Sequence, residues 1–227
     1  MNQIQFSNRN IISSLGATAF ASGLCFLFLD KLCYQLPSEE QLPGDVVALL
    51  DFVGSFGHGN ICLLAILLIW NLDRSGRRGI QLVLGSTVLA GAVTSILKVT
   101  IHRARPFIPP ISPDELGLGS NRGTTIFDNG MQSFPSGHTA TAFALATALS
   151  VMYPQGKRFF FFLAIMVGLQ RVATQSHFPS DVVVGAMIGI LSTHAIGTFI
   201  QSRNRSSANS LPRVLSTPIS EATQRCA

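Results

Sequence analysis

Charged residues are scarce in this chain of 227 residues, at 12% of the total, whereas a soluble globular domain carries about 25%. Hydrophobic residues make up 47%. A soluble all-helical protein with buried helices is the alternative interpretation, but such a protein would need many more charges on its surface. The composition therefore favours a membrane protein.

Several kinds of site are also missing. The four cysteines are scattered along the chain, at Cys25, Cys33, Cys62 and Cys226, which is not a disulfide framework. No residues have the spacing of metal ligands, and no glycine-rich nucleotide loop follows a strand. Because strand patterns and internal repeats are absent as well, the sequence predicts an all-α fold without a metal or a cofactor.

Apolar residues gather in six stretches, near 11–29, 59–72, 80–97, 137–152, 159–173 and 182–200. A membrane-spanning helix needs about 20 such residues, and several stretches approach that length. The first could be a cleaved signal peptide, but its apolar run exceeds the ~7–15 residues of a signal's hydrophobic region. We therefore predict a retained first helix and a bundle of six transmembrane helices.

Three other segments have their own character. Residues 44–57 carry apolar side chains at helical spacing with polar residues between them, which predicts an amphipathic helix in the membrane interface. Residues 107–135 form a loop rich in glycine and proline, and loops of that length are usually functional or disordered. Residues 202–227 lack periodicity, so we predict a disordered cytoplasmic tail after an integral membrane domain of residues 1–201.

Basic residues are distributed unevenly between the two ends of the predicted helices. With the amino terminus in the cytoplasm, residues 1–10, 73–79, 153–158 and 201–227 hold ten basic and two acidic residues, and the other side holds six basic and nine acidic. The positive-inside rule supports this orientation in the cell membrane. The net charge of +5 therefore indicates cytoplasmic anchoring and not nucleic-acid binding, and Cys33 is expected near the outer surface, within reach of an impermeant thiol reagent.

Ionisable residues beside spanning helices are costly, so they are candidates for function. The first cluster of them is Lys98, Arg105 and Pro106, at the end of the third stretch. Basic residues there could simply snorkel to the interface and anchor the helix. They lie, however, on the side with few basic residues, and the planar guanidinium of arginine suits a phosphate. The helix is expected to end before Pro106.

The second cluster is Pro135, Ser136, Gly137 and His138, at the start of the fourth stretch. Proline and serine are ordinary signals of a helix start. A helix start also presents free backbone N–H groups and a positive dipole to an anion, and glycine lets that backbone approach closely. His138 would then be placed to protonate a group bound there.

The third cluster is Arg171, His177 and Asp181, between the fifth and sixth stretches. An interfacial histidine beside an acid at a helix start is common, but a carboxylate can also hold one imidazole nitrogen and leave the other as a nucleophile. The predicted topology places all three clusters at the outer end of the bundle. Together they supply cations, a helix amino terminus, two histidines and a carboxylate, which is a complete set for phosphoryl transfer to a side chain.

These residues resemble the motifs of the type 2 phosphatidic acid phosphatase superfamily, which includes membrane lipid phosphate phosphatases, soluble acid phosphatases and vanadium haloperoxidases. Lys98 with Arg105-Pro106 resembles the first motif, Pro135 to His138 the second, and Arg171, His177 and Asp181 the third. Gln170 stands where the family usually has serine, which puts one polar contact in question.

The resemblance implies a role for each of these residues. His177 would be the nucleophile that forms a phosphohistidine, Asp181 would orient it, and His138 would protonate the leaving alcohol. The phosphate oxygens would be held by Lys98, Arg105, Ser136, Gly137 and Arg171, without a metal. His102 and Arg103 lie outside the motif, and we interpret them as rim groups near a lipid headgroup.

We therefore expect a phosphatase of lipid metabolism that hydrolyses a lipid phosphate monoester or diphosphate at the outer membrane face. Phosphatidic acid, phosphatidylglycerol phosphate, an isoprenoid diphosphate and a lipid A phosphate all fit such a site. A phosphotransferase is the alternative, because the same intermediate serves both reactions. A haloperoxidase is disfavoured since those relatives are soluble. A transporter would need polar groups near the midplane, and an inactive binding protein would not need an intact catalytic set.

Overall fold

The computed structural model describes residues 22–37, 41–72, 77–107 and 132–209. Every regular element in these ranges is helical, apart from an isolated bridge between Arg103 and Gln132. This confirms the all-α prediction for the described residues. The elements are η1 (Cys25–Leu29), η2 (Asp30–Gln35), α2 (Gly44–Ser55), α3 (Gly59–Leu72), α4 (Arg77–Thr100), α5 (Gly137–Met152), η6 (Pro154–Gly156), α6 (Lys157–Ala173) and α7 (Pro179–Asn209).

The five predicted apolar stretches from 59–72 onward are all helical, as α3 to α7. Two helical segments, Gly79–Thr100 and Pro179–Asn204, are long and apolar enough to cross a membrane. Helices α2 and α3 together make a third candidate span, which is bent by 53°. The chain therefore has the apolar helices of a membrane protein. The count of six transmembrane helices stays a prediction, since most of the stretch 11–29 lies outside the described residues.

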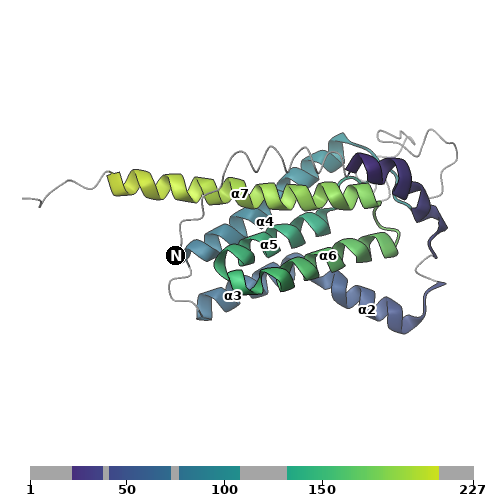
Figure 1. The fold of residues 1–227 in the computed structure, drawn as a ribbon, viewed down its shortest axis with the longest axis horizontal. Helices are drawn as coiled ribbons and strands as arrows, with labels where there is room; N and C mark the ends of the chain where they lie inside the picture. Colours follow the sequence, from purple (N-terminus) through teal and green to yellow (C-terminus); the bar gives the residue numbers. More distant parts are fainter. Residues whose placement is uncertain (1–21, 38–40, 73–76, 108–131, 210–227) are drawn as a thin grey trace, which may run out of the picture.

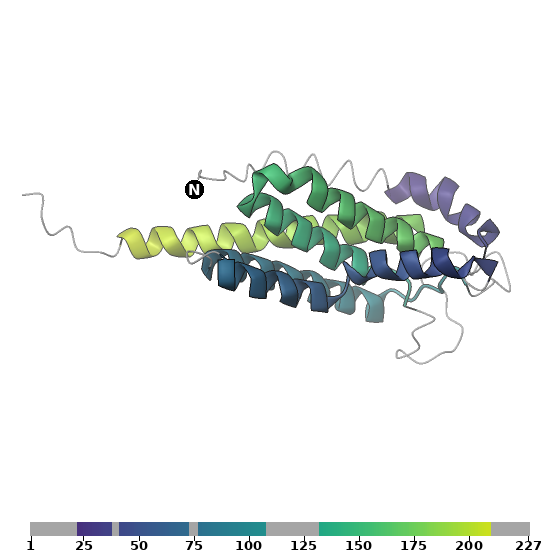
Figure 2. The ribbon, with the colours of Figure 1, turned by 90° about the horizontal axis from the view of Figure 1, so that it is seen from below.

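Helices α4 to α7 lie side by side as a bundle, and α7 projects beyond it (Figures 1 and 2). Glycine makes the closest contact between α5 and α7 possible. A Cβ atom on Gly185 would lie 2.5 Å from the Ser136 carbonyl oxygen, and one on Gly189 would overlap the backbone of Ala140. Small residues four apart let two helix backbones approach in this way. As a result the starts of α5 and α7 are joined, and the Ser136 amide donates to the Asp181 carbonyl at 3.1 Å.

Large apolar side chains cover much of the outer surface of the bundle. Examples on four helices are Leu64, Val88, Phe162 and Phe199, each at least half exposed. A protein surrounded by water rarely exposes so many apolar groups, and contiguous apolar surface of this kind marks a contact with another apolar phase. The surface agrees with the composition in favouring a bilayer environment.

Three predictions need adjustment. Residues 44–55 do form a helix, but its place in the membrane interface stays a prediction, because it continues into α3 through a bend. Helix α7 runs to Asn209, so residues 202–209 are not disordered, and the rest of the predicted tail lies outside the described residues. Most of the loop 107–135 lies outside them as well.

Cys33 is not a surface thiol. Its side chain is 1% exposed, and burial together with the nearby Asp30 raises the pKa of the Cys33 thiol to about 12. Because the thiolate is the reactive form of cysteine, Cys33 cannot report membrane orientation to a thiol reagent. The prediction that it would be labelled is wrong.

Candidate active site

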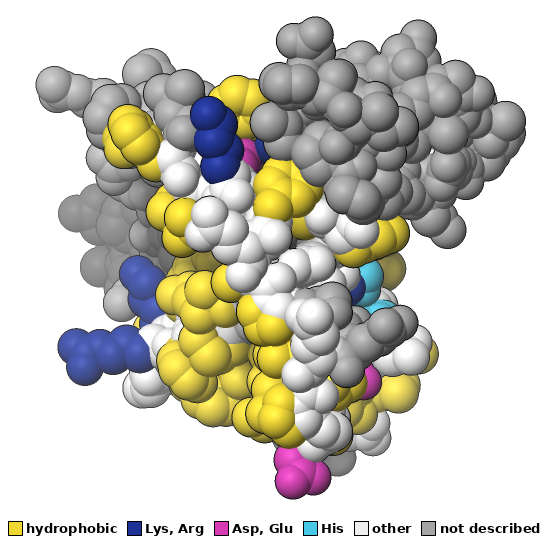
Figure 3. All heavy atoms as spheres, turned by 90° about the vertical axis from the view of Figure 1, so that its right-hand side faces the viewer, with side chains coloured by type: hydrophobic (Ala, Val, Ile, Leu, Met, Phe, Trp, Pro, Cys, Tyr) yellow, Lys and Arg dark blue, Asp and Glu magenta, His cyan; other side chains and the backbone are white. Residues whose placement is uncertain are grey.

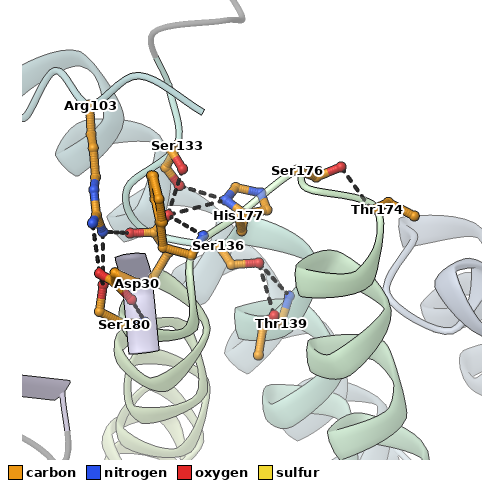
Figure 4. Close-up of polar contacts among 11 residues, drawn as sticks. Asp30, Arg103, Ser133, Ser136, Thr139, Thr174, Ser176, His177 and Ser180 are labelled. Atoms are coloured by element: carbon orange, nitrogen blue, oxygen red, sulfur yellow. Dashed lines mark hydrogen bonds and ion pairs between the residues drawn. The ribbon is translucent and has the colours of Figure 1, made fainter. Parts of the chain in front are cut away.

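The three motifs meet at one end of the bundle. His177 lies in the turn between α6 and α7, Asp181 in the first turn of α7, and His138 in the first turn of α5. The polar groups around His177 are drawn in Figure 4. On the face that closes this end of the molecule, histidine and basic side chains reach the surface next to one another (Figure 3).

His177 is held with one nitrogen as a donor. Its side chain is 1% exposed, and Nδ1 lies 2.6 Å from the Ser133 carbonyl oxygen (Figure 4). A carbonyl can only accept, so Nδ1 carries the hydrogen and Nε2 of the neutral ring keeps its lone pair. Burial lowers the pKa of His177 below its ordinary value, although Asp181 opposes the shift. The ring is therefore neutral at pH 7, with Nε2 available to attack.

Asp181 acts on His177 mostly through neighbouring groups. Its Oδ2 lies 3.8 Å from His177 Nδ1, which is an ion-pair distance and too long for a hydrogen bond. The same oxygen accepts from the Ser133 hydroxyl at 2.5 Å and from the Phe178 amide at 3.0 Å. Asp181 thus fixes the segments on both sides of the imidazole. The motifs gave no signal for Ser133, which contacts His177 through its backbone.

Arg103 is not a rim group. Its side chain is 1% exposed, and its guanidinium lies 4.0 Å from the centre of the Phe178 ring. One terminal nitrogen pairs with Asp181, and the other donates to Asp30 at 2.7 Å. The interpretation of Arg103 as a rim group is wrong because it rested on the residue's place in the sequence. It did not consider that buried acids need a cation beside them. Asp30, at the end of an apolar stretch, was the available signal.

Asp30 completes this buried network. Its carboxylate accepts from the Ser180 hydroxyl at 2.5 Å and from the Ser180 amide at 3.1 Å, and Ser180 also accepts from Arg103 at 2.8 Å (Figure 4). The network joins the start of η2, the loop after α4 and the start of α7. His102, beside Arg103, is half-buried, and its rim position stays a prediction.

Replacing Arg103 with methionine should destabilise the purified protein by about 3–5 kcal/mol, because it leaves two buried carboxylates without their cation. A lowered midpoint of thermal unfolding in detergent would measure this. The matched control is Lys31→Met, which removes an exposed cation from the same end of the molecule and should change the midpoint little. Equal midpoints for the two variants would show that the network contributes no stability.

The three predicted phosphate-binding cations surround the two histidines. Lys98 lies in the last turn of α4, Arg105 in the loop after it, and Arg171 in the last turn of α6. The charges of Lys98 and Arg105 act on His177, and those of Lys98 and Arg171 act on His138. Helix α4 ends at Thr100, before Pro106 as expected. Arg105 Nε is buried without a hydrogen-bond partner among the described residues.

Ser136 and Gly137 form the start of α5. Ser136 is the N-cap, and its fully buried hydroxyl accepts from the Thr139 amide at 3.4 Å and contacts Thr139 Oγ1 at 2.8 Å. This is the ordinary capping role, so a phosphate contact by the hydroxyl stays a prediction. A Cβ on Gly137 would meet only Thr94 Oγ1, at 3.8 Å. Packing therefore does not demand glycine there, and close approach of a phosphate to its backbone stays a prediction.

The departure from the family pattern at Gln170 is accommodated by its neighbours. Gln170 is 1% exposed, and its Oε1 accepts from Arg171 Nε at 2.6 Å. A Cβ on Gly54 of α2 would lie 3.1 Å from the Gln170 side chain, so glycine there leaves room for a side chain longer than serine. Gln170 therefore orients the Arg171 guanidinium.

No group of three or more histidine, cysteine or acidic side chains is placed to hold a metal within the described ranges. Metal independence therefore stays a prediction, and chelation is its direct test.

The chain is similar to membrane lipid phosphatases of known sequence. It is 33% identical to the lipid A 1-phosphatase of Rhizobium etli over 106 residues, which cover 46% of this chain and 43% of that protein. It is 30% identical to the probable lipid phosphate phosphatase 4 of Arabidopsis thaliana over 130 residues, covering 46% and 42%. The chain thus spans less than half the length of these curated relatives.

Two crystal structures have a similar fold. LpxE of Aquifex aeolicus matches with a TM-score of 0.58 and 24% identity, covering 76% of this chain and 94% of that one. The PAP2-type phosphatidylglycerolphosphate phosphatase of Bacillus subtilis matches with a TM-score of 0.52 and 18% identity, covering 87% and 89%. Residues 80–205, more than half of the chain and all three motifs, match the PAP2 superfamily. The chain belongs to the PAP2 superfamily.

Proposed function

We propose that this protein hydrolyses a phosphate ester of a membrane lipid through a phosphohistidine on His177. The observation that carries the proposal is the hydrogen bond from His177 Nδ1 to the Ser133 carbonyl. It fixes a neutral, buried imidazole with its lone pair on Nε2, and the nearby cations Lys98 and Arg105 would attract the phosphate to that nitrogen.

The reaction has two steps. In the first, His177 Nε2 forms a bond to phosphorus while the bond to the lipid oxygen breaks, and that oxygen takes a proton from His138. In the second, water gives a proton to His138 and attacks the phosphohistidine, the bond between nitrogen and phosphorus breaks, and inorganic phosphate leaves. Lys98, Arg105, Arg171 and the amino terminus of α5 at Gly137 would stabilise the charge on the phosphoryl oxygens in both steps.

A lipid is the proposed substrate class because the site lies at one end of a bundle with exposed apolar faces. The names of the relatives support the same class, since they include a lipid A 1-phosphatase and a lipid phosphate phosphatase. The choice among phosphatidic acid, phosphatidylglycerol phosphate, a lipid A phosphate and an isoprenoid diphosphate is left to experiment.

Purified protein should release inorganic phosphate from at least one lipid in a panel of these four, and the rate should survive excess EDTA. The physical reason is that three cations replace a metal in neutralising the phosphate. Vanadate, which adopts the five-coordinate geometry of the transition state, should inhibit. Loss of activity on chelation, restored by Mg²⁺, would contradict metal independence. Faster lipid consumption than phosphate release when an acceptor alcohol is added would indicate a phosphotransferase.

The active site is proposed to face the extracytoplasmic side of the cell membrane, on the support of the basic residues at the opposite end of the helices. Cysteines introduced at two exposed positions test this in a background without Cys226. An impermeant thiol reagent on intact spheroplasts should label Lys31→Cys, at the active-site end, and should spare Gln155→Cys, between α5 and α6. Labelling of Gln155→Cys alone would reverse the orientation.

A further inference from the structure

A third histidine reaches the candidate active site from the bend between α2 and α3. His58 Nε2 lies 3.4 Å from His138 Nε2, and the two ring centres are 4.6 Å apart with the rings at 76°. None of the three motifs includes His58. Its side chain is exposed, whereas that of His138 is half-buried, so the pair leads from the interior of the site to the surface.

The backbone before His58 is shaped to make this contact. A Cβ on Gly57 would lie 2.9 Å from Val167 Cγ1 and 3.0 Å from His138 Cβ. Only glycine lets the bend pack this closely against α5 and α6. The position of His58 beside His138 is therefore a consequence of local packing and not of a flexible surface side chain.

The hydrogen bonds indicate which ring of the pair donates to the other. His58 Nδ1 lies 3.1 Å from the Gly54 carbonyl oxygen, which can only accept, so Nδ1 carries the hydrogen. In the neutral ring Nε2 is then an acceptor. The donor between the two rings must be His138 Nε2–H, which leaves His138 Nδ1 as the nitrogen available to a leaving oxygen.

We propose that His58 is the proton relay of His138, supplying the proton that His138 gives to the leaving lipid oxygen. This inference rests on the role of general acid proposed for His138. His58 does not touch the substrate and acts through His138, so it is a positioning residue that also carries a proton. A doubly protonated His138 is opposed first by its burial and then by the charges of Arg171, Lys98 and the neighbouring histidines His58 and His177. Holding the proton on the exposed His58 ring avoids the cost of burying it.

The protons balance over the two steps. In the first, His58 with both nitrogens protonated passes its Nε2 proton to His138 Nε2, while the Nδ1 proton of His138 moves to the lipid oxygen as its bond to phosphorus breaks. This leaves the hydrogen-bond arrangement described above. In the second, His138 Nδ1 takes a proton from the attacking water, and its Nε2 proton returns to His58 Nε2, which restores the starting state.

The test is His58→Gln, whose amide can still hydrogen-bond to His138 but cannot carry a proton. First-turnover rates are measured with phosphatidic acid or whichever panel lipid is active, and with p-nitrophenyl phosphate. The lipid rate should fall at least about tenfold, a part of the roughly 10²–10⁴-fold that general acid catalysis contributes. The aryl rate should fall less than about twofold, because nitrophenolate leaves without a proton. Imidazole in the buffer should restore the lipid rate.

Two controls separate the relay from other effects. His194→Gln removes a half-buried histidine further along α7 and should leave the ratio of the two rates unchanged. His58→Asn keeps a polar group near the Gly54 carbonyl and should behave as His58→Gln, which guards against a folding defect specific to one variant. Equal losses on both substrates, or no loss on the lipid, would overturn the relay.

His138→Ala, assayed alongside, distinguishes the relay from the proposed function. If that variant loses lipid activity selectively while His58→Gln resembles the unmodified protein, the relay is wrong and the proposed role of His138 stands. If His138→Ala loses both activities equally, the role of His138 as leaving-group acid is wrong, and the relay through His58 is wrong as well.

Discussion

Replacing His177 with alanine should abolish turnover on every substrate, whatever its leaving group. The expected loss is on the order of 10⁴- to 10⁶-fold, the scale seen when an enzyme loses its nucleophile. The reason lies in this site, because the Ser133 carbonyl fixes the lone pair of the buried His177 ring on Nε2. Without that nitrogen no phosphoenzyme can form.

The measurement is phosphate release together with trapping of labelled phosphate on the protein. The matched control is His194→Ala, a half-buried histidine further along α7, which should keep its activity and its phosphoenzyme. An acid-labile phosphoenzyme that still forms in His177→Ala would show that another residue is the nucleophile.

Loss of His138 should depend on the substrate. His138→Ala should lose about 10²–10⁴-fold on a lipid phosphate, because an alkoxide cannot leave without a proton. It should lose far less on p-nitrophenyl phosphate, whose leaving group is a stable anion. The aryl substrate should therefore still place phosphate on His177.

This comparison uses first-turnover rates, since His138 is also proposed as the base for water in the second step. A burst of nitrophenol followed by slow turnover is the expected pattern for the variant. Equal losses on both substrates during the burst would contradict the role as leaving-group acid.

The motif residues could be predicted because the signal for each of them lies in its own stretch of the sequence. Lys98 and Arg105 are cations beside an apolar helix, and His177 and Asp181 are ionisable residues four apart at the start of another. Placing such side chains at a membrane surface costs free energy, which points to function. The helices could be predicted for the same reason, since apolar runs of that length are expensive outside a bilayer or a core. The structure brings these residues together as the topology predicted.

The supporting residues could not be predicted, because their partners are distant in the sequence. Arg103 is 73 residues from Asp30 and 78 from Asp181, and His58 is 80 residues from His138. Spacing along one chain carries no information about such pairs. Ser133 was missed for another reason, since it contacts His177 through a carbonyl, a group that every residue has.

The end of α7 shows that a polar composition alone does not predict disorder. Residues 202–209 lack an apolar pattern, yet a helix that is already formed extends at low cost, because each added residue gains one backbone bond. Serine side chains add bonds to the backbone there, from Ser202 to Phe199 at 2.8 Å and from Ser206 to Ser202 at 3.2 Å. A polar sequence after a long helix therefore need not be disordered.

The network around Asp30 also sets an order of events during synthesis. Asp30 leaves the ribosome early, but Arg103 follows 73 residues later and Ser180 150 residues later. At a rate of about 5–20 residues per second, the carboxylate waits roughly eight to thirty seconds for its last partner. Asp30 can pair with Arg103 first, but its two bonds to Ser180 form only after the start of α7 has been made. The buried network beside His177 is thus completed late in synthesis, after α4, α5 and α6.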